Sequence, residues 1–159
     1  MPHRARRRPE RLERDIETDF AACDDRSVNQ PLSRLRIPFV EHLGITLTEQ
    51  SRERASIILD KRAELLNSWG AAHGGVVMTM LDYVMSAAVR GHYGVDGGVL
   101  TVDLSVGFMN AGLSDRILAD ARVLHAGQST AFCESEARDE GGKLLAKAIG
   151  TFKLLGERK

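Results

Sequence analysis

The stretch HGGVVMTMLDYVMSAAVR, residues 73–90, decides the fold. Two glycines open it, and the apolar side chains that follow fall on more than one helical face, which predicts a helix buried nearly all round. Those apolar residues are Val76, Val77, Met80, Leu81, Val84, Met85, Ala88 and Val89. Between Gly74 and Val89, Asp82 is the only residue whose side chain is charged at neutral pH. A buried carboxylate is costly unless it is hydrogen-bonded or has a chemical role.

The two glycines add a second feature at the beginning of this helix. Backbone N–H groups there have no intrahelical acceptor, and the positive end of the helix dipole lies behind them. A donor for a developing oxyanion and a buried carboxylate on one helix are typical of acyl-transfer chemistry. A structural interpretation also fits these residues: Gly74 and Gly75 would form a turn, and Asp82 would be paired in an interior network.

The residues before the helix extend the pattern. Asn67 is followed by a glycine-bearing loop, then by His-Gly-Gly at 73–75, and Leu81-Asp82 comes after five further residues. This arrangement resembles the signature of the hotdog-fold thioesterases related to the phenylacetate-degradation (PaaI-like) thioesterase. The resemblance covers about residues 37–155. It implies a hotdog fold, an acyl-CoA substrate and hydrolysis of the thioester.

Length and composition set the outer limits. The chain has 159 residues, enough for one domain with a sizeable core. The formal net charge is zero, so the overall charge gives no indication of a nucleic-acid or membrane partner. No apolar run reaches membrane-spanning length, and the N-terminus lacks the apolar segment of a secretory signal. We therefore expect a cytoplasmic protein.

Two cysteines, Cys23 and Cys133, are too few for a disulfide framework or a zinc site. We expect both to be free thiols in a reducing compartment. We also expect no metal, and no cofactor beyond the coenzyme A that is part of the substrate.

The chain divides into two regions by composition. Residues 1–36 form a charged extension, Arg-rich at first and acidic around Asp15–Asp25, which we expect to be partly disordered or helical. The acidic residues favour a solvated tail over a nucleic-acid site at the first arginines. Residues 37–156 are expected to form the thioesterase domain.

Outside the long helix, alternation of apolar and polar residues predicts strands. They are expected at residues 45–49, 54–59, 100–109, 116–125, 130–138 and 143–155, after a short helical turn at 38–44. In the cleanest strand, the alternate residues from Leu100 to Phe108 should share one face that covers the core. One long helix and a meander of strands is an α+β layout: an antiparallel sheet of five to six strands wrapped around the helix. This agrees with the hotdog fold that the resemblance implies.

The candidate catalytic residues begin with Gly74 and Asp82. A thioester carbonyl becomes an oxyanion when it is attacked, and the Gly74 N–H is the expected donor to that charge. Asp82 is the expected base or nucleophile, because burial raises the pKa of a carboxyl and makes it a better proton acceptor near neutral pH. The residues leave open whether Asp82 attacks directly or activates water.

Four other residues complete the candidate site. The Asn67 amide suits holding the attacking water or the thioester oxygen, and the resemblance gives the Thr101 hydroxyl the task of placing that water. His73 is expected to be structural, bonded to the Asn67 loop, and with Gly75 to border the substrate. Trp69 is expected to pack as a lid on a pocket edge. Candidates for the coenzyme A phosphates are Arg116, Arg138, Lys143 and Lys153.

Spacing also predicts how the site is assembled. Gly74 and Asp82 lie roughly 12 Å apart along a helix that rises about 1.5 Å per residue. One thioester can hardly contact both groups within a single chain. A two-fold dimer removes the difficulty, with Gly74 and Asn67 of one chain facing Asp82 and Thr101 of the other. We expect such a homodimer, and pairing into a homotetramer stays open.

We therefore predict an acyl-CoA thioesterase for a small aryl or medium-chain acyl group, as in phenylacetic acid degradation. The alternative is a non-catalytic acyl-CoA-binding regulator on the same fold, which would carry a DNA-binding helix-turn-helix ahead of it. The extension before residue 37 has few apolar positions for such a module. A hotdog dehydratase or hydratase would pair a His with an acid in a motif that this chain lacks.

Overall fold

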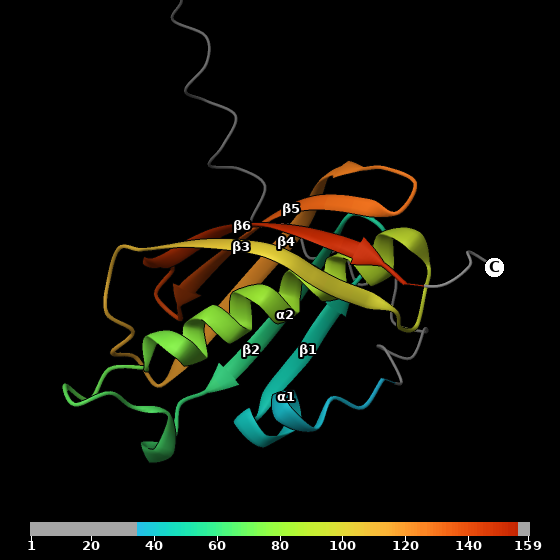
Figure 1. Ribbon diagram of the computed structural model, residues 1–159. Helices are drawn as coiled ribbons and strands as arrows, with labels where there is room; N and C mark the ends of the chain where they lie inside the picture. Colours follow the sequence, from blue (N-terminus) through green and yellow to red (C-terminus); the bar gives the residue numbers. More distant parts are fainter. Residues whose placement is uncertain (1–34, 156–159) are drawn as a thin grey trace, which may run out of the picture. The chain divides into compact units, whose positions relative to one another are not determined.

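The computed structural model describes residues 35–155 (Figure 1). The predicted N-terminal extension therefore lies outside the described residues except for its last two. Within the described part, no helix is long and apolar enough to cross a membrane. Cys133 is a free, buried thiol, and burial raises its pKa to about 12, so it is neutral at physiological pH.

The long helix α2, Gly74–Tyr93, confirms the prediction from the opening stretch. His73 caps its N-terminus, where the His73 side chain accepts a hydrogen bond from the Gly75 N–H. Gly94, in the left-handed conformation, caps its C-terminus. Its core-facing side chains, among them Met80 and Leu81, are fully buried. Burial on several faces follows from the sheet, which contacts α2 through all six of its strands.

All six strands form one antiparallel sheet in the order β1-β2-β4-β5-β6-β3. They are β1 Ile45–Gln50, β2 Arg54–Asp60, β3 Val99–Phe108, β4 Arg116–Ala126, β5 Thr130–Asp139 and β6 Leu144–Leu154. A short helix α1, Pro38–Leu43, precedes β1, and a 3-10 turn η1, Ala63–Leu65, follows β2. Figure 1 shows α2 lying across one face of the sheet. The predicted α+β layout is confirmed, and β1 and β3 are the two edges of the sheet.

The first half of β3 departs from the prediction. A bulge between Thr101 and Asp103 shifts its register against β6. Because the Thr101 hydroxyl bonds Asp82 on α2, Leu100 must point to the other face, where it is 52% exposed. After the bulge, Leu104 and Val106 pack against the core as predicted. The expected single apolar face from Leu100 to Phe108 is therefore wrong, and the bulge is what turns Thr101 toward the helix.

Gly91, near the end of α2, lies where the helix touches the turn after β1. A Cβ atom at Gly91 would lie 2.2 Å from the backbone oxygen of Ser51. We expect Gly91→Ala to lower the free energy of unfolding by about 1–3 kcal/mol, because overpacking forces the backbone to move. Urea denaturation measures the change. Gly97→Ala is the matched control, since its Cβ meets nothing within 4 Å; equal stability of the two variants would contradict the packing argument.

Candidate functional site

The Asn67 loop, residues 66–72, is held by its own backbone. Leu66 and Ala72 form a β-bridge, and the Asn67 N–H donates to the Ala71 oxygen at 2.8 Å. The Asn67 side-chain oxygen accepts from the Trp69 N–H at 2.9 Å and from the Ala71 N–H at 3.2 Å. Among the described residues the Asn67 NH₂ group has no recorded acceptor. The acceptor half of this amide therefore shapes the loop, and the donor half is available to a ligand.

The tip of this loop carries Trp69, which is 88% exposed. Within its own chain it does not pack on the edge of a pocket, contrary to the expectation. The side chain projects from the turn at Gly70, whose φ of 74° is in the left-handed region.

The two glycines at the beginning of α2 differ in what they offer. The Gly75 N–H donates to Nδ1 of His73 at 3.0 Å, so it is already occupied. His73 thus bonds its own helix through its side chain, and its backbone N–H donates to Leu65, not to the loop around Asn67 as expected. For the Gly74 N–H no acceptor is recorded within residues 35–155. Only Gly74 therefore presents a free donor at the helix terminus.

Gly74 and Asn67 border the same cavity, which has a volume of about 310 Å³. Its other walls are mainly apolar and come from the end of β3, the loop after it and β6, including Phe108 and Leu145. The Phe108 ring lies about 3.7 Å from where a Gly74 Cβ would stand. The structure thus brings Gly74, the predicted oxyanion donor, to the same cavity as Asn67, which is predicted to hold the attacking water or the thioester oxygen. The apolar setting strengthens hydrogen bonds to both.

Asp82 and Thr101 form a second pair. The Thr101 hydroxyl donates to Oδ1 of Asp82 at 2.8 Å, joining β3 to the middle of α2. Partial burial raises the pKa of the Asp82 carboxyl, and the bond from Thr101 opposes that rise in part. A carboxylate with a raised pKa, held by one hydroxyl, is suited to accept a proton from water.

The two pairs do not meet within one chain. Neither Asp82 nor Thr101 lines the cavity that holds Asn67 and Gly74. Each chain therefore carries a donor half, Asn67 with Gly74, and a carboxylate half, Asp82 with Thr101.

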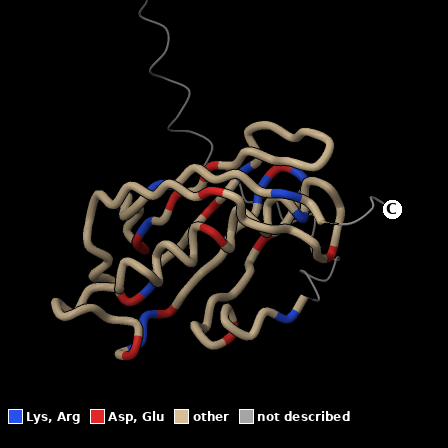
Figure 2. The backbone as a smooth tube through the Cα atoms, in the orientation of Figure 1, with Lys and Arg blue, Asp and Glu red and all other residues tan. Residues whose placement is uncertain are grey.

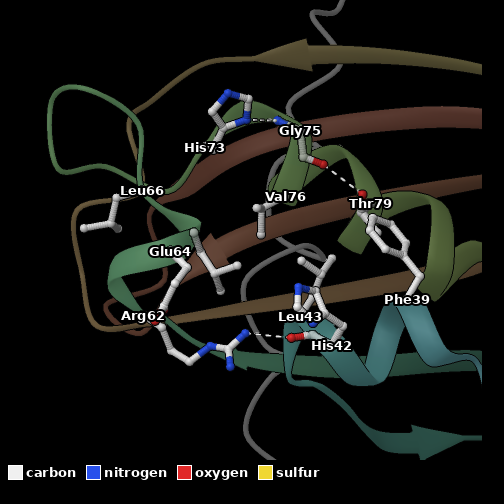
Figure 3. Close-up of a pocket in the computed structure, with 11 residues that line it drawn as sticks. Phe39, His42, Leu43, Arg62, Glu64, Leu66, His73, Gly75, Val76 and Thr79 are labelled. Atoms are coloured by element: carbon white, nitrogen blue, oxygen red, sulfur yellow. Dashed lines mark hydrogen bonds between the residues drawn. The ribbon is translucent and has the colours of Figure 1, made fainter.

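A second cavity, of about 630 Å³, lies between α1, η1 and the first turns of α2 (Figure 3). Its floor is apolar, with Leu43 and Val76, and the Arg62 guanidinium at its edge donates to the His42 backbone oxygen at 2.7 Å. His73 and Gly75 line this cavity and not the one with Gly74. Sequence reasoning missed it, because the lining residues come from three separate segments and share no motif.

Several charged side chains outside the site form ion pairs. Basic and acidic segments are adjacent at several points in Figure 2. Arg116 pairs with Asp60 at 2.7 Å and Arg138 with Glu136 at 2.6 Å, so these two candidates for phosphate binding are engaged. No group of three His, Cys, Asp or Glu side chains within residues 35–155 could hold a metal ion.

The Thr101 bond leads to a prediction for the pH profile. Thr101→Val removes a bond that favours the charged carboxylate, so the pKa of Asp82 should rise further. If Asp82 acts as a base, the acid limb of kcat/KM then moves to higher pH. The fall in kcat/KM should be confined to the acid side of the profile, where the Asp82 carboxyl takes up a proton and no longer acts as a base. Thr101→Ser keeps the hydroxyl and should retain the wild-type profile; an unshifted profile for Thr101→Val would count against the role of this bond.

Comparisons with known proteins agree with this architecture. Residues 70–146 match the model of the Thioesterase superfamily. The solved structure of conserved protein PA5202 from Pseudomonas aeruginosa is 31% identical and superposes with a TM-score of 0.72, covering 76% of this chain and 95% of that one. A putative esterase from Mycobacterium tuberculosis, Rv1847, is 27% identical with a TM-score of 0.71, over 77% of this chain and 100% of that one.

A third relative has a named activity. The medium/long-chain acyl-CoA thioesterase YigI of Escherichia coli is 25% identical over 131 residues, which cover 73% of this chain and 84% of YigI. Placement among the phenylacetate-degradation thioesterases stays a prediction. The protein belongs to the thioesterase superfamily, and its long helix packed against six antiparallel strands is the hotdog fold of that superfamily.

Proposed function

We propose that the protein is an acyl-CoA thioesterase of the PaaI-like kind, acting on a small aryl or medium-chain acyl-CoA. The observation that carries the proposal is the pair of half-sites: free donors at Gly74 and Asn67, and a carboxylate of raised pKa at Asp82. The named activity of YigI supports acyl-CoA as the substrate class.

Each group has a defined task in the proposed reaction. The Gly74 N–H and the Asn67 NH₂ donate to the thioester oxygen as it gains negative charge. Asp82 takes a proton from the attacking water, or attacks the carbonyl itself to form an anhydride that water then opens. In both routes the carbon–sulfur bond breaks and coenzyme A leaves as the thiol, while the acyl group becomes the free acid.

The separation of the half-sites supports a two-fold homodimer as the active form. Gly74 and Asp82 lie eight residues apart on one helix, roughly 12 Å along its axis. In an isologous dimer the donor half of one chain meets the carboxylate half of the other, which makes two equal sites. β3 is an edge strand whose outer hydrogen-bonding groups have no partner strand among residues 35–155, which supplies a means of pairing.

Hydrolysis of a panel of acyl-CoAs, with released thiol detected by a thiol reagent, tests the proposal. We expect turnover with aryl- or medium-chain acyl-CoA and less with acetyl-CoA. Binding of acyl-CoA without release of thiol, across the whole panel, would overturn the enzymatic assignment and favour the acyl-CoA-binding alternative.

A further inference from the structure

Trp69 is the most exposed large apolar side chain of the described residues. It is also the single tryptophan of the chain. A tryptophan side chain can bury about 150–250 Å² of surface. A tryptophan that stays exposed to water therefore lacks the large favourable free energy of burying that apolar surface. Such a residue is typical of the central contacts of interfaces.

The exposure of Trp69 results from a constrained loop. The β-bridge between Leu66 and Ala72 closes the loop, and Asn67 binds its interior through both its backbone and its side chain. The Trp69 N–H is itself one of the bonded groups. The backbone that carries the indole is therefore constrained, which reduces the entropy cost of a contact there.

The Asn67 loop is continuous with the free edge of the sheet. The Ala72 N–H donates to the Gly112 oxygen at 2.9 Å, which ties the loop to the segment that follows β3. That segment and the end of β3 expose three more large apolar side chains: Phe108, Met109 and Leu113. An apolar surface beside an unpaired edge strand is typical of a protein–protein contact.

The occupant that fits this surface is a second copy of the chain. Residues 65–72 carry no charged side chain. The loop is therefore complementary to an apolar partner surface and not to a charged one. The surface also holds the donor half of the site, whose complement is the carboxylate half on another copy. Because Trp69 follows Asn67 by two residues, the pairing that joins the halves also brings the indole next to the other subunit.

We propose that Trp69 crosses the subunit interface and covers the carboxylate half of the partner subunit, beside the partner's Asp82. This inference rests on the proposed function and its dimer. The indole acts as a positioning residue: it excludes water from the carboxylate that receives the proton. Each shared site then takes three groups from one chain, Asn67, Trp69 and Gly74.

Fluorescence of the full chain tests the contact directly, because Trp69 is the single tryptophan. In the ligand-free assembled protein, we expect blue-shifted emission and acrylamide quenching about threefold weaker than for free indole, as befits a buried aromatic contact. Dissociation by dilution, followed by sedimentation, should restore the strong quenching of an 88% exposed side chain.

The outcomes separate this inference from the proposed function. A dimer with strongly quenched Trp69 overturns the contact and leaves the thioesterase proposal standing. Protection that begins only when acyl-CoA is added to Asp82→Asn shows that the ligand covers the indole, and also overturns it. An active monomer would overturn the contact and the shared site together.

The pH profile supplies a second readout. Trp69→Ala should admit water to the carboxylate of the partner's Asp82 and so lower the pKa of that carboxyl. The acid limb of kcat/KM then moves to lower pH. Trp69→Phe should retain most of the shielding. Folding should be unaffected, because the side chain contacts little of its own chain. Phe39→Ala is the control: Phe39 is 59% exposed, but it belongs to α1 and its ring lies near Thr79 (Figure 3). An unshifted limb for Trp69→Ala, or an equal shift for Phe39→Ala, would contradict the role.

Discussion

Asp82→Asn is expected to keep the fold and to lower kcat on the best acyl-CoA by at least about 100-fold, the usual contribution of a catalytic base. Asparagine has nearly the same shape, and its oxygen can still accept the bond that Thr101 now donates at 2.8 Å. Only the capacity to take a proton, or to attack the carbonyl, is lost. Thiol release under saturating substrate measures the change, and thermal denaturation checks the fold.

Asp96→Asn is the matched control for this prediction. Asp96 is exposed in the connection between α2 and β3, away from both half-sites, and its substitution should leave kcat at the wild-type level. If Asp82→Asn stays within a few-fold of wild type, the assignment of Asp82 fails. The donor half would then need another nucleophile or base opposite it.

The elements of this fold were largely predictable, because their signals are local. Burial on several faces predicted α2, and the left-handed Gly94 that ends it is the kind of residue expected there. The bulge in β3 was not predictable, since strict alternation assumes that every residue has a partner on the neighbouring strand. The register against β6 breaks between Thr101 and Asp103, and only the paired strands reveal it. The prediction for the first 34 residues stays untested by the described structure.

The candidate site was also predictable in part. Asp82 stood out because a lone carboxylate among apolar residues has few structural explanations, and the structure supplies its raised pKa and its partner Thr101. The difference between Gly74 and Gly75 depends on the side chain of His73, which occupies one of two otherwise equivalent donors. Sequence spacing cannot show that choice. It also cannot show the cavity beside α1, which forms only when distant segments pack.

Mixing two inactive variants should restore activity if each site is shared between subunits. The structure suggests sharper variants than alanine for this experiment. Asn67→Asp keeps the oxygen that accepts from Trp69 and Ala71 and removes the NH₂ donor, so the loop should hold its shape. Asp82→Asn removes the base and leaves the donor half intact. Each variant alone should be strongly impaired, because both of its sites lack one group.

Co-expression of Asn67→Asp and Asp82→Asn, with a different tag on each chain, produces half heterodimers by random pairing. In a heterodimer the site that takes Asn67 from the second chain and Asp82 from the first is intact, and the other site carries both changes. One site in four is then functional, and we expect roughly a quarter of wild-type activity in the mixture. Purification through both tags should raise this to about half. Sites built within single chains would each keep one defect, so the mixture would stay as inactive as either parent and the shared-site dimer would be excluded.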